Sequence, residues 1–165
     1  MQTQEAIAGR RSCRQFIDKE IPKEDLLKLI DAGRLAATAR NEQPWEFIVI
    51  TDKDKKSEIA RLTANNGPFI AEAFACIVVL CADTKYYLED GSSAITNILL
   101  MATGLGIGSC WVAGDKKPYC QALKEILKVP AEYKPVGLIA LGYPKNSPAA
   151  IAKRGLKEVL HWQKF

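Results

Sequence analysis

The sequence lacks the closely spaced histidines and cysteines that most zinc sites and redox-active cysteine sites require. His161 is the only histidine, and no two of the five cysteines have Cys-x-x-Cys spacing. Protein zinc sites take several closely spaced histidine or cysteine ligands, so we expect no metal site. The odd number of cysteines and the lack of a recognisable signal peptide favour free thiols and a cytoplasmic location.

Long apolar segments and dense basic stripes are also missing. The central apolar run, residues 74–82, is far shorter than the ~20 residues that cross a bilayer. The net charge is +4, and the basic residues are scattered except at Arg10, Arg11 and Arg14. Nucleic-acid binders usually concentrate their positive charge on one face. We therefore expect neither a membrane nor a nucleic acid as a partner.

Helices are predicted where apolar residues recur at helical spacing between recognisable ends. Pro22 followed by Glu24 and Asp25 is typical of a helix start. The apolar stripe of this helix is expected to comprise Leu26, Leu27 and Ile30 with Leu35 or Ala37. The other expected helices are a short one capped by Thr3 and ended by Gly9, one over 52–64, a buried one over 92–103 ended by Gly104, and one containing Leu123, Ile126 and Leu127.

Strands are predicted between these helices. Residues 45–50 form a β-branched and aromatic run, and the continuous apolar run 75–81 is typical of a strand covered on both faces. Residues 109–113 and 136–141 predict two further short strands. The mixture indicates an α+β protein, and no repeat or low-complexity linker divides it. We expect residues 1–165 to form a single domain.

The end of the chain differs in composition from the rest. After Gly142-Tyr143-Pro144 it becomes rich in proline, asparagine and lysine, and it closes with Leu156, Val159, Leu160 and Trp162. Apolar side chains such as these are rarely left in water. The tail is expected either to close over its own core or to cross to a partner chain.

Two polar segments are candidates for ligand binding. Arg10, Arg11, Ser12 and Arg14 offer guanidinium groups and a hydroxyl to a phosphate, although a solvated basic turn has the same composition. Thr38, Asn41 and Gln43 stand before Pro44-Trp45 and carry groups that both donate and accept hydrogen bonds. They suit the edge of a planar heterocycle, or an ordinary helix-to-strand turn.

Taken together, these segments resemble the nitroreductase family. The resemblance begins with Arg-Arg-Ser-x-Arg-x-Phe at 10–16 and Ala-x-x-x-Asn-x-Gln-Pro-Trp at 37–45. It continues through the glycine-rich segment 104–111, Leu141-Gly-Tyr-Pro144, Lys153-Arg154 and His161-Trp162, and so covers nearly the whole chain. It implies a three-layer α/β/α fold with a mixed, mainly antiparallel sheet, and a homodimer with FMN at the subunit interface. The C-terminal arm is expected to be exchanged between the subunits.

The resemblance also implies roles for individual residues. The cofactor-binding residues are expected to be Arg10, Arg11, Ser12, Arg14, Thr38, Asn41, Gln43, Ala113, Gly114, Lys153 and Arg154. Arg10, Ser12 and the Lys153-Arg154 pair would hold the phosphate, and Arg14 would lie near the pyrimidine side of the flavin. Thr38, Asn41 and Gln43 would reach the flavin from the partner subunit. A backbone N–H of the 113–114 segment would approach flavin N5, while Asn65 or Asn66 matches only loosely.

Several further features of the sequence concern the fold, the thiol Cys110 and the flavin site. Gly104, Gly106 and Gly108 follow a helix and precede a strand, the reverse of a dinucleotide-binding fingerprint. Cys110 is expected to be a small buried residue rather than a reactive thiol. Ala37-Thr38 stands where the family often has Pro-Ser, which keeps the hydroxyl but not the rigid proline. The short stretch between Gly114 and Leu123 leaves little room for a segment that covers the substrate.

The expected activity is a transfer of two electrons from NADH or NADPH, through bound FMN, to a nitroaromatic or quinone-like acceptor. No protein group is identified as a catalytic residue, because the flavin supplies the redox chemistry. Electronic tuning is assigned to Arg14, Ala113 and Gly114. Two alternatives stay open: another flavin reaction of the family, such as dehalogenation or desaturation, and an FMN-holding or redox-sensing protein without turnover.

Overall fold

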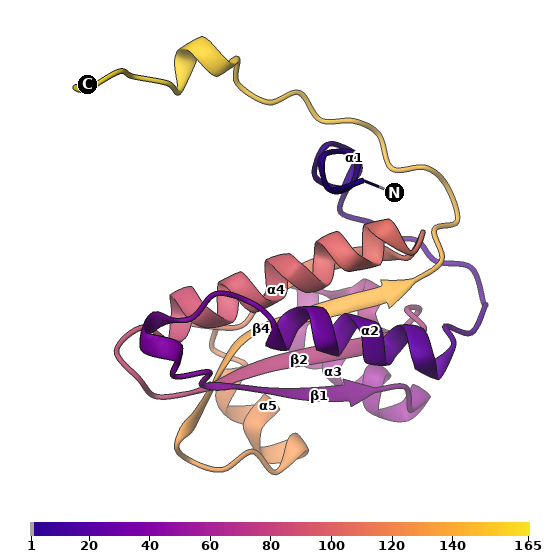
Figure 1. The fold of residues 1–165 in the computed structure, drawn as a ribbon. Coiled ribbons are helices and arrows are strands. Elements are labelled where there is room, and N and C mark those ends of the chain that lie inside the picture. Colours follow the sequence, from indigo (N-terminus) through magenta and orange to yellow (C-terminus); the bar gives the residue numbers. More distant parts are fainter. Residues whose placement is uncertain (1) are drawn as a thin grey trace.

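The computed structural model describes residues 2–165 and is organised around a four-stranded sheet (Figure 1). Its strands are β1 (Trp45–Ile50), β2 (Ala75–Ala82), β3 (Gly108–Ala113) and β4 (Tyr133–Gly142), in the order β1-β2-β4-β3. All neighbouring strands pair antiparallel. Within residues 2–165 the parallel component is one isolated bridge between Ser12 and Ser109. The predicted strands are confirmed, and β4 extends three residues further toward the N-terminus than expected.

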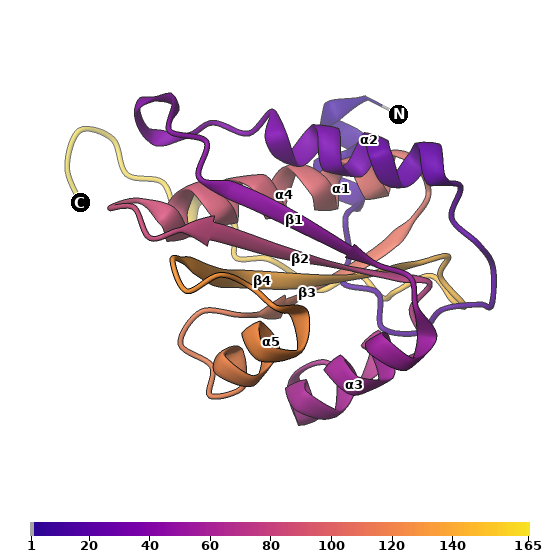
Figure 2. The same cartoon turned by 90° about the horizontal axis from the view of Figure 1, so that it is seen from below.

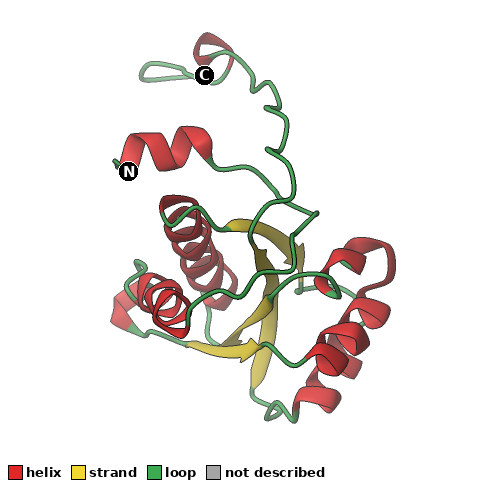
Figure 3. Cartoon of the chain, turned by 90° about the vertical axis from the view of Figure 1, so that its right-hand side faces the viewer, coloured by secondary structure: helices red, strands yellow, loops and turns green. Residues whose placement is uncertain are grey.

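Helices cover both faces of the sheet, as Figures 2 and 3 show. On one face lie α2 (Lys23–Arg34) and α4 (Tyr87–Gly104), with the short α1 (Thr3–Gly9) beside α4. On the other lie α3 (Lys53–Thr63) and α5 (Cys120–Leu127). Short 3-10 turns occur at Ala39–Asn41, Ala64–Asn66, Pro68–Ile70 and Leu156–Glu158. The three-layer α+β architecture is therefore confirmed.

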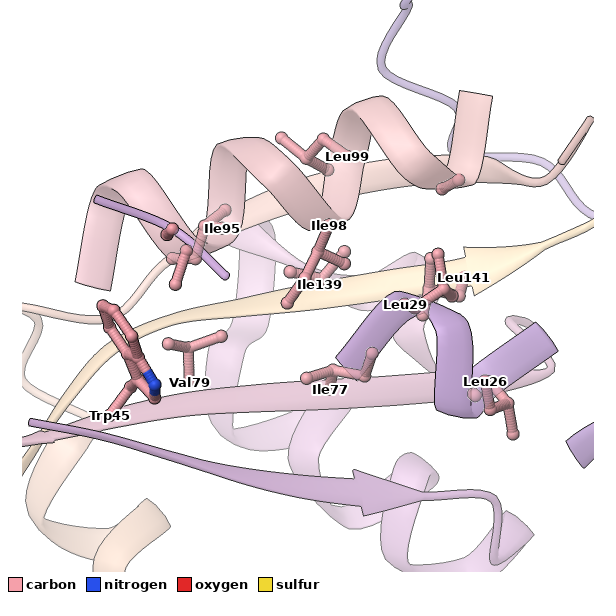
Figure 4. Packing of buried hydrophobic residues seen from close by; sticks show 14 of the residues in the cluster. Leu26, Leu29, Trp45, Ile77, Val79, Ile95, Ile98, Leu99, Ile139 and Leu141 are labelled. Carbon is pink, nitrogen blue, oxygen red and sulfur yellow. The ribbon is translucent and has the colours of Figure 1, made fainter. Parts of the chain in front are cut away.

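Strand β2 explains why the sequence carries a continuous apolar run. Ile77 and Val79 face the layer of α2 and α4, where they pack with residues such as Ile98 (Figure 4). Cys76 and Val78 face the other layer, together with side chains from α3 and α5. Because successive side chains of a strand point to opposite faces, a strand covered on both sides needs apolar residues at every position.

The structure corrects the predicted apolar stripe of α2. Leu29 is completely buried, whereas Leu27 is 60% exposed and Leu35 is 63% exposed. The inner line is Leu26, Leu29 and Gly33, at the i, i+3, i+7 spacing of one helix face. A Cβ at Gly33 would lie 2.9 Å from the Ile98 side chain, so the glycine allows α2 to approach α4 closely.

Two predicted helix ends are also corrected. Thr3 is the first residue of α1 rather than its cap, and the preceding Gln2 donates its backbone N–H to the Glu5 carboxylate at 2.8 Å. At the end of α4, Gly104 is the last helical residue. Gly106 has the positive φ of +72° that turns the chain toward β3, a conformation that glycine adopts at little cost.

The C-terminal arm, residues 145–165, runs away from the layered body (Figure 1). Residues 151–165 are all exposed, including Ile151, Leu156, Trp162 and Phe165. The arm therefore does not close over its own core. None of the helices in residues 2–165 has the length and apolarity that a membrane crossing requires.

Candidate functional site

A cavity of about 310 Å³ joins the two ends of the chain. Its lining residues come from the end of α1, the arginine turn (residues 10–14) and the C-terminal arm: Ile7, Ala8, Arg10, Arg11, Ser12, Arg14, Ala149, Ile151 and Lys153. The lining includes three arginines and one lysine but no carboxylate. A cavity with this set of donors suits a phosphate, which guanidinium groups bind through paired N–H donors.

The three arginines of this turn differ in how the protein holds them. Arg11 Nη1 donates to the carbonyls of Ala8 at 2.7 Å and Arg10 at 2.9 Å, so this guanidinium fastens the end of α1. Arg14 lies with its Cζ 5.7 Å from the centre of the Phe69 ring. Within residues 2–165 no protein acceptor engages the Arg10 guanidinium, which leaves its donors for a ligand.

The arginine turn is anchored to the edge of the sheet. Ser12 forms the bridge with Ser109 of β3, and the backbone N–H of Cys13 donates to the Ser109 carbonyl at 2.9 Å. Cys13 packs over Gly108, where a Cβ would lie 2.9 Å from the cysteine Sγ. These contacts place the cavity beside the first residues of β3, close to the C-terminal end of α4.

The far end of β3 presents the backbone of Ala113 to the open edge of the sheet. Ala113 stands opposite Gly137, and the next amide, that of Gly114, donates to the Val136 carbonyl at 3.2 Å. In such a pair the N–H and C=O of Ala113 point away from β4. The Ala113 carbonyl accepts the Tyr119 hydroxyl. Of the 113–114 segment, Ala113 rather than Gly114 therefore offers an outward N–H.

Gly114 packs tightly against the backbone of β4. A Cβ there would lie 2.8 Å from the backbone nitrogen of Gly137 and 2.8 Å from the carbonyl carbon of Val136. Real Cβ atoms do not approach backbone this closely, so Gly114 permits the close approach of two chain segments. Its own amide is already used in the sheet.

Further polar and aromatic groups gather near this end of β3. A Cβ at Gly67 would lie 3.0 Å from Val112, so the turn at 64–70 packs on the strand. Asn66 accepts from Lys117 Nζ at 3.4 Å, and Phe69 meets Arg14. Sequence reasoning missed Phe69 and Lys117, because neither stands in a motif and only the fold brings them here.

The amide loop, residues 38–43, lies elsewhere. Thr38, Asn41 and Gln43 do not line the cavity. The Thr38 hydroxyl donates to Asp90 near the start of α4, whereas the arginine turn lies near the end of that helix. The 18 residues of α4 span about 27 Å. The predicted site residues therefore form two separate groups within this chain.

Neither Arg154 nor Cys110 lines the cavity. Arg154 follows Lys153 on the exposed arm but is not in the cavity lining. Cys110 is 2% exposed, and burial raises the pKa of its thiol, so it is protonated at neutral pH. A protonated, buried thiol is a poor nucleophile. The prediction that Cys110 is a small buried residue is confirmed.

Comparison with known proteins adds a second line of evidence. The model of the family described as "Nitroreductase family" matches residues 7–79 and 82–143. A protein of Archaeoglobus fulgidus named "Putative NADH dehydrogenase/NAD(P)H nitroreductase" is 39% identical over 148 residues, which cover 85% of this chain and 84% of the relative. A protein of the same name from Methanothermobacter thermautotrophicus is 31% identical over 154 residues, covering 90% of this chain and 80% of the relative.

A solved structure agrees with both the fold and the sequence match. The FMN-dependent nitroreductase of Clostridium difficile superposes with a TM-score of 0.92 at 31% identity, covering 98% of this chain and 99% of the other. The match extends over the arginine turn, the amide loop and the arm. By its sequence and its fold, the chain belongs to the nitroreductase family.

Proposed function

We propose that this protein is an FMN-dependent oxidoreductase that passes two electrons from NADH or NADPH to an electron-poor acceptor such as a nitroaromatic or a quinone. The observation that carries the proposal is the cavity in which Arg10, Arg14 and Lys153 gather without a carboxylate, beside the open edge of β3. The names of the relatives, which include an NAD(P)H nitroreductase and an FMN-dependent nitroreductase, support the same activity.

The polar residues of the cavity have separate roles in this proposal. Arg10, Ser12 and Lys153 bind the phosphate of FMN, joined by Arg154 from the arm. Arg11 holds the end of α1 in place through its hydrogen bonds to two carbonyls. Lys153 ties the arm to the phosphate, so cofactor binding and arm position are coupled.

Arg14 and the groups near the end of β3 would hold the flavin ring. Bound FMN supplies the two-electron redox chemistry. Arg14 stabilises negative charge at the pyrimidine side, since a fixed cation favours the form that carries the charge. The outward N–H of Ala113 would donate a hydrogen bond to flavin N5, and Asn66 would lie near the ring edge. Gly114 keeps Ala113 in place by allowing close contact with β4.

A homodimer completes the site. Thr38, Asn41 and Gln43 do not line the cavity and lie roughly 20 Å away from it along α4, so in this proposal they serve the flavin held by the partner subunit. The exposed apolar residues of the arm, such as Leu156 and Trp162, become buried against the second subunit. Residues 1–165 then act as one domain that exchanges its arm, and we place the protein in the cytoplasm.

The test is a steady-state assay with purified protein supplied with FMN. NADH or NADPH oxidation is followed while the concentration of a quinone, and separately of a nitroaromatic, is varied. The proposal predicts turnover that requires FMN and gives parallel double-reciprocal lines, because donor and acceptor use one site in turn. Retained FMN without turnover of either acceptor would instead favour another flavin reaction or a flavin-holding role.

A further inference from the structure

We propose that Asp90 is a positioning residue that holds the amide loop, residues 38–43, in the conformation that presents Asn41 and Gln43 to the flavin. The inference rests on the proposed function for the identity of the ligand. The contact between Asp90 and the loop is itself a feature of this chain. Asp90 lies on α4 and accepts hydrogen bonds from residues 38 and 39, which precede it by 52 and 51 positions.

The loop is held in an unfavourable backbone conformation. Arg40, Asn41 and Gln43 have φ values of +53°, +59° and +49°, and none of them is glycine. The left-handed region is costly for residues with a Cβ, although asparagine tolerates it better than most. Backbone strain of this kind persists only where neighbouring structure enforces it, and it is frequent at ligand-binding sites. Something outside the loop must therefore hold it.

Asp90 supplies that hold through both carboxylate oxygens. Oδ2 accepts the Thr38 hydroxyl at 2.9 Å, and Oδ1 accepts the backbone N–H of Ala39 at 3.0 Å. Thr38 Oγ1 in turn accepts the backbone N–H of Gln43 at 3.1 Å. The chain of bonds thus runs from α4 through Thr38 to the far end of the loop. Both ends of the strained segment are fixed by one carboxylate.

Asp90 is buried, and its two carboxylate oxygens accept hydrogen bonds from the amide loop. Its side chain is 4% exposed, and within residues 2–165 no lysine or arginine forms an ion pair with it. Burying a carboxylate is costly unless hydrogen bonds replace its lost hydration. The bonds to the amide loop provide that replacement, assisted by the positive end of α4. A neutral apolar residue would pack here at lower cost if holding the loop were not required.

Loss of the Asp90 hydrogen bonds would displace the amide side chains of Asn41 and Gln43. Gln43 Nε2 lies 3.4 Å from the Asn41 carbonyl, so these two residues are arranged together at the tip of the loop. When the hold is lost, the left-handed residues relax and both amides leave their positions. Asp90 thereby governs flavin affinity without touching the flavin.

The experiment compares Asp90→Ala and Asp90→Asn with wild type and with the matched control Glu89→Gln. Glu89 neighbours Asp90 on α4 and is exposed, so this control removes the same charge near the same helix end. Opening of the loop is read in the protein without flavin, from the rate of tryptic cleavage after the exposed Arg40, with fragments identified by mass. The Kd for FMN is measured in parallel by quenching of flavin fluorescence.

We expect Asp90→Ala to speed cleavage after Arg40 and to raise the Kd for FMN, each by about tenfold. Asp90→Asn keeps the size and one acceptor and falls between Ala and wild type, while Glu89→Gln matches wild type. If the alanine variant does not fold, the cleavage rate and the Kd of Asp90→Asn alone test the proposal.

The proposal is overturned if the Asp90 variants keep the wild-type cleavage rate, if cleavage rises while the Kd is unchanged, or if Glu89→Gln has the same effect as Asp90→Asn. If wild-type protein binds no FMN, the proposed function fails. The cleavage rates then still decide whether Asp90 holds the loop.

Discussion

The arginines at 10 and 11 provide the sharpest test of the cavity, because they are adjacent in sequence and differ in contacts. The perturbation is the pair of single variants Arg10→Ala and Arg11→Ala. The Arg11 guanidinium donates hydrogen bonds to the carbonyls of Ala8 and Arg10, whereas within residues 2–165 the Arg10 guanidinium has no protein acceptor. We expect Arg10 to contact the phosphate of FMN directly and Arg11 to act mainly on the end of α1.

The magnitude follows from this difference. A hydrogen bond to a charged group contributes about 1.5–3 kcal/mol, so removal of Arg10 raises the Kd for FMN by roughly 10- to 150-fold. Arg11 acts on the phosphate only as a more distant, partly solvated charge, and interactions of that kind are worth about 1 kcal/mol or less. Arg11→Ala therefore raises the Kd by roughly fivefold at most.

The assay measures FMN and riboflavin binding by flavin fluorescence at constant ionic strength. Riboflavin lacks the phosphate, so the same Arg10→Ala substitution is expected to leave its Kd unchanged. Arg61→Ala, an exposed arginine on α3 outside the cavity, controls for the loss of one positive charge. Equal effects of the two variants on FMN, or an equal effect of Arg10→Ala on riboflavin, would refute the assignment of the phosphate site.

Three further predictions concern stability and reactivity. The hydrogen bond from the Tyr87 hydroxyl to Asp115, and secondly burial, raise the pKa of Tyr87 to about 12. The stabilisation that this hydrogen bond gives the folded state is therefore fully present below the unfolded pKa of about 10 and is lost as the pH rises toward 12. Urea unfolding should show Tyr87→Phe less stable than wild type at pH 9, with a smaller gap at pH 11; a constant gap would contradict this. Gly114→Ala should cost about 1–3 kcal/mol of unfolding free energy because its Cβ meets backbone, and an unchanged urea midpoint would show that the segment relaxes freely. Burial raises the pKa values of Cys76 and Cys81 to about 12, so a thiol reagent at pH 8 should label them only after unfolding, as mass mapping would reveal.

Much of the architecture was predictable because it depends on local patterns. The continuous apolar run of β2 and the spacing of Ile95, Leu99 and Ala102 in α4 each reflect burial that the sequence records directly. The error in α2 arose where two apolar faces competed. Leu27 and Leu35 are apolar but exposed, and only packing against α4 decides that Leu29 and Gly33 face inward.

The site was less predictable, because its residues are distant in sequence and the backbone strain of the amide loop leaves no pattern in the sequence. The cavity joins Arg10 to Lys153, which no local pattern connects. The hold of Asp90 on Thr38 depends on the placement of α4 against the loop. Arg40 adopts a left-handed conformation although it is not a glycine, so its residue type does not predict that conformation. The family resemblance singled out the arginine turn, the amide loop and Lys153 as candidates, whereas the fold shows that the turn and Lys153 share a cavity that the amide loop does not line.

The measurement that tests the central proposal most directly is the absorption spectrum of the purified protein, recorded anaerobically before and after addition of NADH and then NADPH. We predict flavin bands that bleach with at least one of the two donors and recover when a quinone is added. A protein that holds no flavin, either as isolated or after incubation with FMN, would contradict it.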